Sequence, residues 1–185
     1  MAVTPSSMLP LGTIAPDFSL ENTIDQRQVS LQQVKGPKGT VVMFICNHCP
    51  YVIHILDKVL EVVKHYQAQG INFIAISAND IENYPQDAPD KMQQLAQQKQ
   101  FSFPYLYDET QEVAKAYQAA CTPDLFVFDK DLKCVYRGRF DGATPGNGVA
   151  VTGDDLKAAL DNLLKGATID SEQRPSMGCN IKWKV

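Results

Sequence analysis

The chain has 185 residues, of which 44% are apolar and 21% are charged, and its formal net charge at pH 7 is −4. This length and apolar content suit one domain with a well-buried core, whereas the negative net charge argues against nucleic acid or an anionic membrane as a partner, since both require a concentrated basic surface. No apolar run reaches the roughly eighteen residues of a membrane span, and the N-terminus lacks a secretion signal, so we expect a cytosolic protein.

The first half of the chain predicts a parallel β-α-β unit. Residues 40–45 form a continuous apolar, β-rich run, as in a strand that is covered on both faces. Apolar residues at helical spacing from 51 to 69 predict a long helix that Gly70 ends, and residues 71–77 form a second buried strand. The order strand, helix, strand predicts a right-handed crossover.

The second half predicts shorter elements around an exposed loop at residues 79–89, which contain Asn, Asp and two prolines. We interpret the acidic residues near this loop as solvated surface: Asp80, Glu82, Asp87 and Asp90. Helices are expected at 90–100, 109–120 and 154–164, strands at 103–107, 125–128 and 134–140, and a glycine-rich loop at 142–148. Residues 167–185 are expected to form an irregular tail.

The cysteines indicate redox chemistry rather than a secreted disulfide scaffold, because their number is odd. They are Cys46, Cys49, Cys121, Cys134 and Cys179. Cys46 and Cys49 lie at the junction of a strand and a helix, where the helix N-terminus stabilises a thiolate and lowers a cysteine pKa from about 8.5 to roughly 3.5–7.5. We therefore expect Cys46 to attack a disulfide and Cys49 to resolve the mixed disulfide.

His48, between the two cysteines, is expected to donate to the Cys46 sulfur or to stabilise its negative charge, which would raise the reduction potential of the pair. A zinc site is the alternative, because zinc binds thiolate and imidazole ligands. No second closely spaced cysteine pair completes a set of four ligands, so we expect neither a metal nor another cofactor.

The run CNHCP after a buried strand, with Thr122-Pro123 opening a later strand, resembles the thioredoxin superfamily. The runs GTIAPDFSL, FICNHCPYV, ACTPDLFVFD and GCNIKW are similar to redoxin proteins of its alkyl hydroperoxide reductase and thiol-specific antioxidant branch. The resemblance implies a single thioredoxin-like domain: a three-layer α/β sandwich with a mixed central sheet, an N-terminal β extension, a core at residues 10–165 and a loop insertion at 79–100. It also implies a cis-proline at Pro123, where the chain would bind a partner through backbone hydrogen bonds.

Two other functions stay open beside disulfide exchange. In a peroxiredoxin-like thiol peroxidase, an antioxidant enzyme, Cys49 or Cys46 would be the peroxidatic cysteine, and Cys49 aligns with its usual position. Cys46 then stands at the usual hydroxyl position and Asp124 at a common arginine position, where a carboxylate would oppose thiolate formation. Arg137 or Arg139 would have to replace that arginine. The third function is a non-catalytic binding protein that responds to the redox state of the dithiol.

Three cysteines lie outside the CxxC pair: Cys121, Cys134 and Cys179. Cys121, two residues before Pro123, is either a further redox thiol or a small buried side chain, and Cys134 is expected to pack in the core. Cys179 becomes a second resolving thiol if the tail folds back. We expect the substrate to be a protein disulfide, a small thiol or a hydroperoxide, with a separate reductant.

Overall fold

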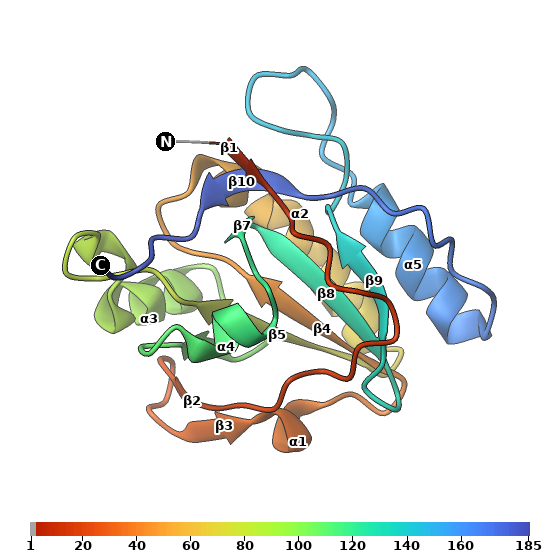
Figure 1. The fold of residues 1–185 in the computed structure, drawn as a ribbon, viewed down its shortest axis with the longest axis horizontal. Helices are drawn as coiled ribbons and strands as arrows, with labels where there is room; N and C mark the ends of the chain where they lie inside the picture. The colour runs from red at the N-terminus through yellow and green to blue at the C-terminus, as the bar shows by residue number, and fades with distance from the viewer. Residues whose placement is uncertain (1–2) are drawn as a thin grey trace.

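A seven-stranded mixed sheet in the order β3-β2-β6-β5-β4-β8-β9 forms the centre of the computed structural model, which describes residues 3–185 (Figure 1). Its strands are β2 (Ser19–Asn22), β3 (Gln28–Ser30), β4 (Gly39–Phe44), β5 (Ile71–Ser77), β6 (Tyr105–Tyr107), β8 (Asp124–Asp129) and β9 (Cys134–Gly138). Strand β4 pairs parallel with β5 and antiparallel with β8. The predicted crossover and the N-terminal β extension are therefore confirmed.

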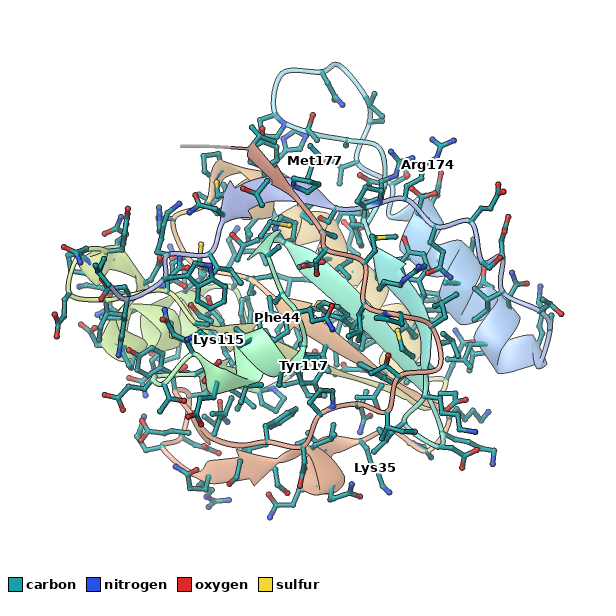
Figure 2. The ribbon with its side chains drawn as sticks, in the orientation of Figure 1. Lys35, Phe44, Lys115, Tyr117, Arg174 and Met177 are labelled. Carbon is teal, nitrogen blue, oxygen red and sulfur yellow. The ribbon has the colours of Figure 1, made fainter. Side chains whose placement is uncertain are left out.

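Helices cover both faces of this sheet and make three layers. The helices are α1 (Leu31–Val34), α2 (Pro50–Gln67), α3 (Pro89–Gln98), α4 (Glu112–Ala116) and α5 (Asp154–Lys165). Because side chains alternate along a strand, Val41 and Met43 of β4 pack in the cluster that contains α2, α3 and α5, whereas Val42 and Phe44 pack with α1 and α4. Phe44 meets Tyr117, just after α4, at a ring distance of 5.6 Å (Figure 2).

The helix expected at residues 109–120 is shorter than predicted. Gln111 and Gln118, on either side of α4, have left-handed φ angles of 65° and 54°, which interrupt helical backbone. The loop expected at 79–89 contains one short 3-10 turn, η1 (Pro85–Asp87). Within residues 3–185, none of the helices combines the length and the apolar character needed to cross a bilayer.

A second sheet of three strands, in the order β1-β10-β7, joins the two ends of the chain. It contains β1 (Val3–Pro5), β7 (Cys121–Thr122) and β10 (Met177–Asn180). The tail expected to be irregular therefore contains a strand, which lies near the start of α2 (Figure 1). A strand in the middle of a sheet is held by backbone hydrogen bonds on both edges, so four residues with little β propensity can still form one.

Candidate active site

The two central cysteines lie where β4 leads into α2. The strand ends at Phe44, and the helix begins at Pro50 with Cys49 as its N-cap residue. The residue at the helix start is Cys49. The prediction that Cys46 occupies this position is therefore wrong. Both side chains are buried, with exposed fractions of 1% for Cys46 and 0% for Cys49.

Thr122 lies against both sulfur atoms. Its hydroxyl oxygen is 3.6 Å from Cys46 Sγ, and its carbonyl oxygen is 3.2 Å from Cys49 Sγ. The peptide bond between Thr122 and Pro123 is cis, as the family resemblance implied. The loop before β8 therefore meets the two cysteines in the fold.

Cys179 supplies a third sulfur, 2.9 Å from Cys49 Sγ. The tail does fold back: β10 pairs antiparallel with β7, so that Cys179 stands opposite Thr122. Cys121, the residue before Thr122, points elsewhere, with its sulfur 3.6 Å from the carbonyl oxygen of Pro123. The structure thus brings Cys46, Cys49 and Cys179 into one cluster.

The surroundings of the two sulfurs place the negative charge on Cys49. The pKa of Cys49 is lowered to about 4, first by the interaction with the Cys46 thiol and then by Cys179, Thr122 and the Val52 amide, against the opposing effect of burial. Although the Thr122 carbonyl favours a protonated sulfur, the donors on the other sides outweigh it.

The pKa of Cys46 is raised, in the opposite direction to the sequence prediction. The largest cause is the interaction with the Cys49 sulfur, followed by burial and by the negative charge of Asp87. The two thiols therefore titrate as a coupled pair, whose pKa values belong to the pair rather than to either sulfur alone.

His48 is held by Asp87 rather than by a cysteine. Its Nδ1 lies 2.6 Å from Asp87 Oδ2, and its ring stacks on Tyr84 with ring centres 5.7 Å apart. The expected donation from His48 to Cys46 is absent from the hydrogen bonds of residues 3–185. The imidazole instead lies over the loop of η1.

Asp87 belongs to the site although the polar sequence around it predicts solvated surface. Its exposed fraction is 0%. Its Oδ1 accepts a hydrogen bond from the Asn47 backbone N–H at 2.8 Å, and its Oδ2 accepts one from Asn79 Nδ2 at 2.9 Å. Nothing local marks this burial, because the donors lie 8 and 40 positions away; the polar composition of the loop suggested the opposite.

Asp124 and the two arginines of the hairpin are engaged elsewhere. Asp124 accepts the Ser6 hydroxyl at 2.8 Å, and burial raises its pKa to about 7. Arg137 donates to the Leu9 carbonyl and to Gln173, and Arg139 donates to Asp155. Neither arginine takes the place beside a sulfur that the peroxidase hypothesis required.

The remaining cysteine positions behave as buried side chains. Burial raises the pKa of Cys134 to about 11, and its sulfur faces the Tyr136 carbonyl in the core, as expected for a packing residue. The pKa of Cys121 is raised by burial and by the charge of Asp124. Cys121 is therefore a poor nucleophile at neutral pH.

One atom each of Cys46, His48 and Asp87 lies within 4.8 Å of the others, a set that includes ligand types of zinc. The Asp87 oxygens, however, already accept backbone and side-chain N–H groups, and one of them binds His48 Nδ1. These groups satisfy one another without an ion, so the donor set does not call for a metal.

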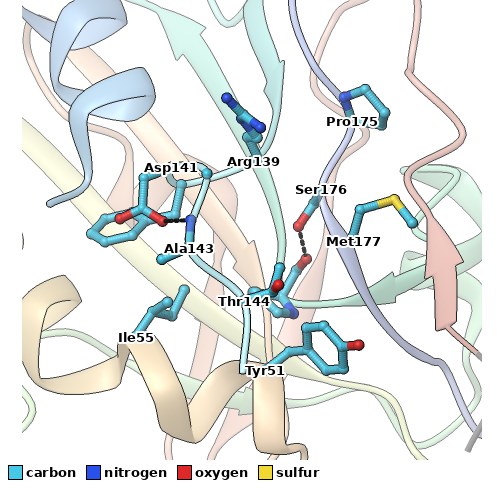
Figure 3. Close-up of a pocket in the computed structure, with 12 residues that line it drawn as sticks. Tyr51, Ile55, Arg139, Asp141, Ala143, Thr144, Pro175, Ser176 and Met177 are labelled. Carbon is cyan, nitrogen blue, oxygen red and sulfur yellow. Dashed lines mark hydrogen bonds between the residues drawn. The ribbon is translucent and has the colours of Figure 1, made fainter. Parts of the chain in front are cut away.

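A small cavity of about 50 Å³ opens beside Pro123 (Figure 3). Tyr51 of α2, Thr144 of the glycine-rich loop and Met177 of β10 line it from three sides. Its wall contains the aromatic ring of Tyr51 and the apolar side chain of Met177. It also contains Ser176, whose hydroxyl donates a hydrogen bond to the Pro123 carbonyl. This cavity is the concave surface next to the loop that touches both sulfurs.

Comparison with known proteins agrees with this geometry. A crystal structure of an uncharacterised conserved protein from Geobacillus kaustophilus is 53% identical, with a TM-score of 0.98 over 100% of this chain and 97% of that chain. The thiol-disulfide oxidoreductase ResA of Geobacillus thermodenitrificans is 25% identical over 130 residues, which is 70% of each chain.

A more distant structure, the C-terminal domain of a thiol-disulfide oxidoreductase assigned in Bacteroides thetaiotaomicron, is 19% identical and has a TM-score of 0.66 over 85% of this chain and 98% of that chain. It shows that the fold is thioredoxin-like. The model of the AhpC/TSA family matches residues 11–137, which include β4, Cys46, Cys49 and the cis-proline Pro123. The chain therefore belongs to the AhpC/TSA family of thioredoxin-like proteins.

Proposed function

We propose that the protein is a thiol-disulfide oxidoreductase whose reacting pair is Cys46 and Cys49. The observation that carries this proposal is the position of both buried cysteines against Thr122, next to the cis-proline, and the lowered pKa of Cys49 agrees with it. A thiolate at neutral pH is the species that attacks disulfides. Membership of a family that contains redox proteins agrees with this chemistry.

Cys49 is the attacking sulfur in this proposal, the reverse of the order expected from the sequence. Its thiolate attacks one sulfur of a partner disulfide, and the other partner sulfur leaves as a thiolate and takes up a proton. Cys46 then loses its proton and attacks Cys49, so that the Cys46–Cys49 disulfide forms and the second partner thiol is released. The CxxC pair gives the partner two electrons; of the two protons that the partner takes up, one comes from Cys46 and the other from solvent.

The partner binds, in this proposal, over the cavity beside Pro123. Tyr51 and Met177 offer apolar contact there, and the exposed fraction of Met177 is 40%. Because both reacting sulfurs are covered, a protein partner requires β10 to move away, whereas a small disulfide requires only a local opening. The chain's own groups suffice for the exchange, with no cofactor, and a separate reductant restores the dithiol.

Trapping of a mixed disulfide tests both the function and the order of attack. The double variant Cys46→Ser/Cys179→Ser keeps the attacking thiolate but removes both neighbouring thiols, so it should accumulate a stable adduct with oxidised glutathione on Cys49. Cys49→Ser should give no comparable adduct, and Cys134→Ser, which changes a buried cysteine outside the site, should behave as the unmodified protein does. If the Cys49→Ser variant formed an adduct on Cys46 as fast as the adduct forms on Cys49, Cys46 would be the attacking sulfur, as the sequence predicts.

Peroxide reduction is the second candidate, and the thiolate character of Cys49 favours it, because a peroxidatic sulfur needs the same charge. The engagement of Arg137 and Arg139 elsewhere argues against it. Rapid mixing of the reduced protein with hydrogen peroxide separates the two functions. Oxidation no faster than that of an ordinary thiol supports exchange, whereas fast formation of a sulfenic acid on Cys49 would assign a peroxidase.

A further inference from the structure

Cys49 lies between two thiols rather than beside one. The Cys46 thiol interacts with it from within the CxxC loop, and Cys179 Sγ lies 2.9 Å away on β10. A disulfide bond measures about 2.05 Å, so the second pair needs to close by less than 1 Å. Cys49 is thus the one sulfur that contacts both of the others.

The position of Cys179 is fixed by backbone pairing on both sides. Cys179 stands opposite Val3 of β1 and opposite Thr122 of β7. Gly178 allows this approach, because a Cβ there would lie 2.0 Å from the Thr122 carbonyl oxygen, which is backbone and has no room to yield. Beyond the strand, the Lys182 amide donates to Asn79 Oδ1 at 2.9 Å. The contact between the sulfurs therefore belongs to an ordered part of the fold.

We propose that Cys179 is a third redox thiol, which takes over the Cys46–Cys49 disulfide to give a Cys49–Cys179 disulfide. This inference rests on the proposed exchange function. The Cys179 thiol loses its proton and attacks the Cys49 sulfur; the bond between Cys49 and Cys179 forms as the bond between Cys46 and Cys49 breaks. Cys46 leaves as a thiolate and takes up the proton, so no external oxidant or reductant is needed.

The electrostatics of the cluster favour attack by Cys179 after Cys49 has been oxidised. In the dithiol form the pKa of Cys179 is raised to about 12, first by burial and then by the Cys49 thiolate. Once Cys49 is part of a disulfide it carries no charge, so the contribution of its charge disappears, while the nearby Lys182 still favours a Cys179 thiolate. Cys179 therefore becomes a better nucleophile only after Cys49 has been oxidised.

The transfer has a structural consequence, because it ties β10 covalently to the start of α2. The tail is then held over the site while Cys46 is returned to the thiol form. Reduction of the Cys49–Cys179 disulfide by an external thiol releases the tail and restores the reduced cluster. The strand that covers the cysteines thereby takes part in their redox cycle.

Tryptic mapping distinguishes the two disulfides. Cleavage after Lys38 and Lys58 leaves Cys46 and Cys49 in one peptide, whereas Cys179 falls in the peptide 166–182, because Pro175 blocks cleavage after Arg174. A Cys46–Cys49 disulfide gives no cross-link between peptides. A Cys49–Cys179 disulfide joins peptide 39–58 to peptide 166–182.

The experiment treats the reduced full-length protein with one equivalent of diamide, quenches it in acid, alkylates it and digests it without reduction. We expect the cross-linked pair of peptides in the unmodified protein and in Cys46→Ser, and its loss in Cys179→Ser and Cys49→Ser. The Cys134→Ser control should retain the cross-link. Circular dichroism verifies that each variant is folded, and the measurement on the unmodified protein depends on no variant.

Failure of this inference is distinct from failure of the proposed function. A Cys46–Cys49 disulfide without any cross-link in the unmodified protein, together with no cross-link in Cys46→Ser, overturns the role of Cys179 and leaves exchange intact. A cross-link that persists in Cys49→Ser also overturns it, because Cys46 would then be the partner of Cys179. Absence of the Cys46–Cys49 disulfide in Cys179→Ser, together with absence of disulfide exchange, overturns the proposed function itself.

Discussion

At the scale of single residues, the site contains two negative groups, the Asp87 carboxylate and the Cys46–Cys49 pair, and each has its own donors. The Asp87 carboxylate is fully buried and binds the CxxC loop through the Asn47 amide and the His48 ring. The Cys49 sulfur, burial and the charge of Asp87 raise the pKa of Cys46, in that order of size. Asp87 is thus a positioning residue, which holds the CxxC loop and adds to the effect of Cys49 and of burial on Cys46.

Asp87→Asn should lower the pKa of Cys46, because it removes a negative charge from its surroundings. We also expect a loss of about 1–3 kcal/mol in the free energy of unfolding, since buried donors lose a charged acceptor. The alkylation rate of Cys46 as a function of pH, followed by mass spectrometry, measures the first effect. Asp90→Asn, a change of an exposed carboxylate in the first turn of α3, is the control; equal pH profiles for both variants would contradict the assigned role.

The thiolate of Cys49 should be visible directly. With its pKa lowered to about 4, the reduced protein should gain thiolate absorbance at 240 nm well below the midpoint of about 8.5 for an ordinary cysteine. Cys49→Ser should lose this low-pH transition, and Cys134→Ser should keep it. A midpoint near 8.5 in the unmodified protein would show that the donors around Cys49 do not stabilise its charge.

At the scale of elements, the strand β10 and the junction of β7 with β8 cover and shape the site. Strand β10 is paired on both edges, and Ile181, just after it, is 1% exposed. On the other side of the cis-proline, the buried carboxylate of Asp124 ties β8 to Ser6, near the N-terminus. Both ends of the chain therefore contribute to the position of Thr122.

Gly178→Ala should displace β10, because the added Cβ would meet the Thr122 carbonyl oxygen. Alkylation of a covered thiol follows the local opening equilibrium, where each 1.4 kcal/mol is a factor of ten, so we expect at least about a tenfold faster reaction of Cys49 with iodoacetamide. Met177→Ala, a change on the exposed side of the same strand, should have little effect on this rate. Equal rates in the two variants would mean that β10 does not limit access.

The ionisation of Asp124 should destabilise the folded protein. Its pKa is about 7 in the fold against an ordinary value of 3.8, so the stability it contributes is complete below about pH 4 and is lost as the pH rises through 7. This difference corresponds to about 4 kcal/mol. The free energy of unfolding, measured with urea from pH 4 to 8, should decline with rising pH. Asp124→Asn should remove the part of this decline that comes from Asp124. The exposed Asp131→Asn should leave it unchanged; a decline that persists in Asp124→Asn would exclude Asp124 as its source.

At the scale of the whole molecule, the features that follow from local pattern were predictable and those made by distant pairing were not. Apolar periodicity located β4, α2 and β5 to within two residues, because these elements form the buried centre. The burial of Asp87 and the strand at Cys179 depend on contacts with segments far away in sequence, which no local pattern records. The proposed attack by Cys49 departs from the order expected from the sequence because Cys49, not Cys46, is the N-cap residue of α2.

The most direct test of the account is a redox titration of the full-length protein in dithiothreitol buffers, with the free thiols counted by alkylation and mass spectrometry. We predict one two-electron transition in which two of the five thiols are lost, present in Cys134→Ser and absent in Cys49→Ser, because Cys49 is common to both proposed disulfides. The same transition in Cys49→Ser, or no loss of thiols in the unmodified protein, would contradict the claim that this chain exchanges disulfides through Cys49.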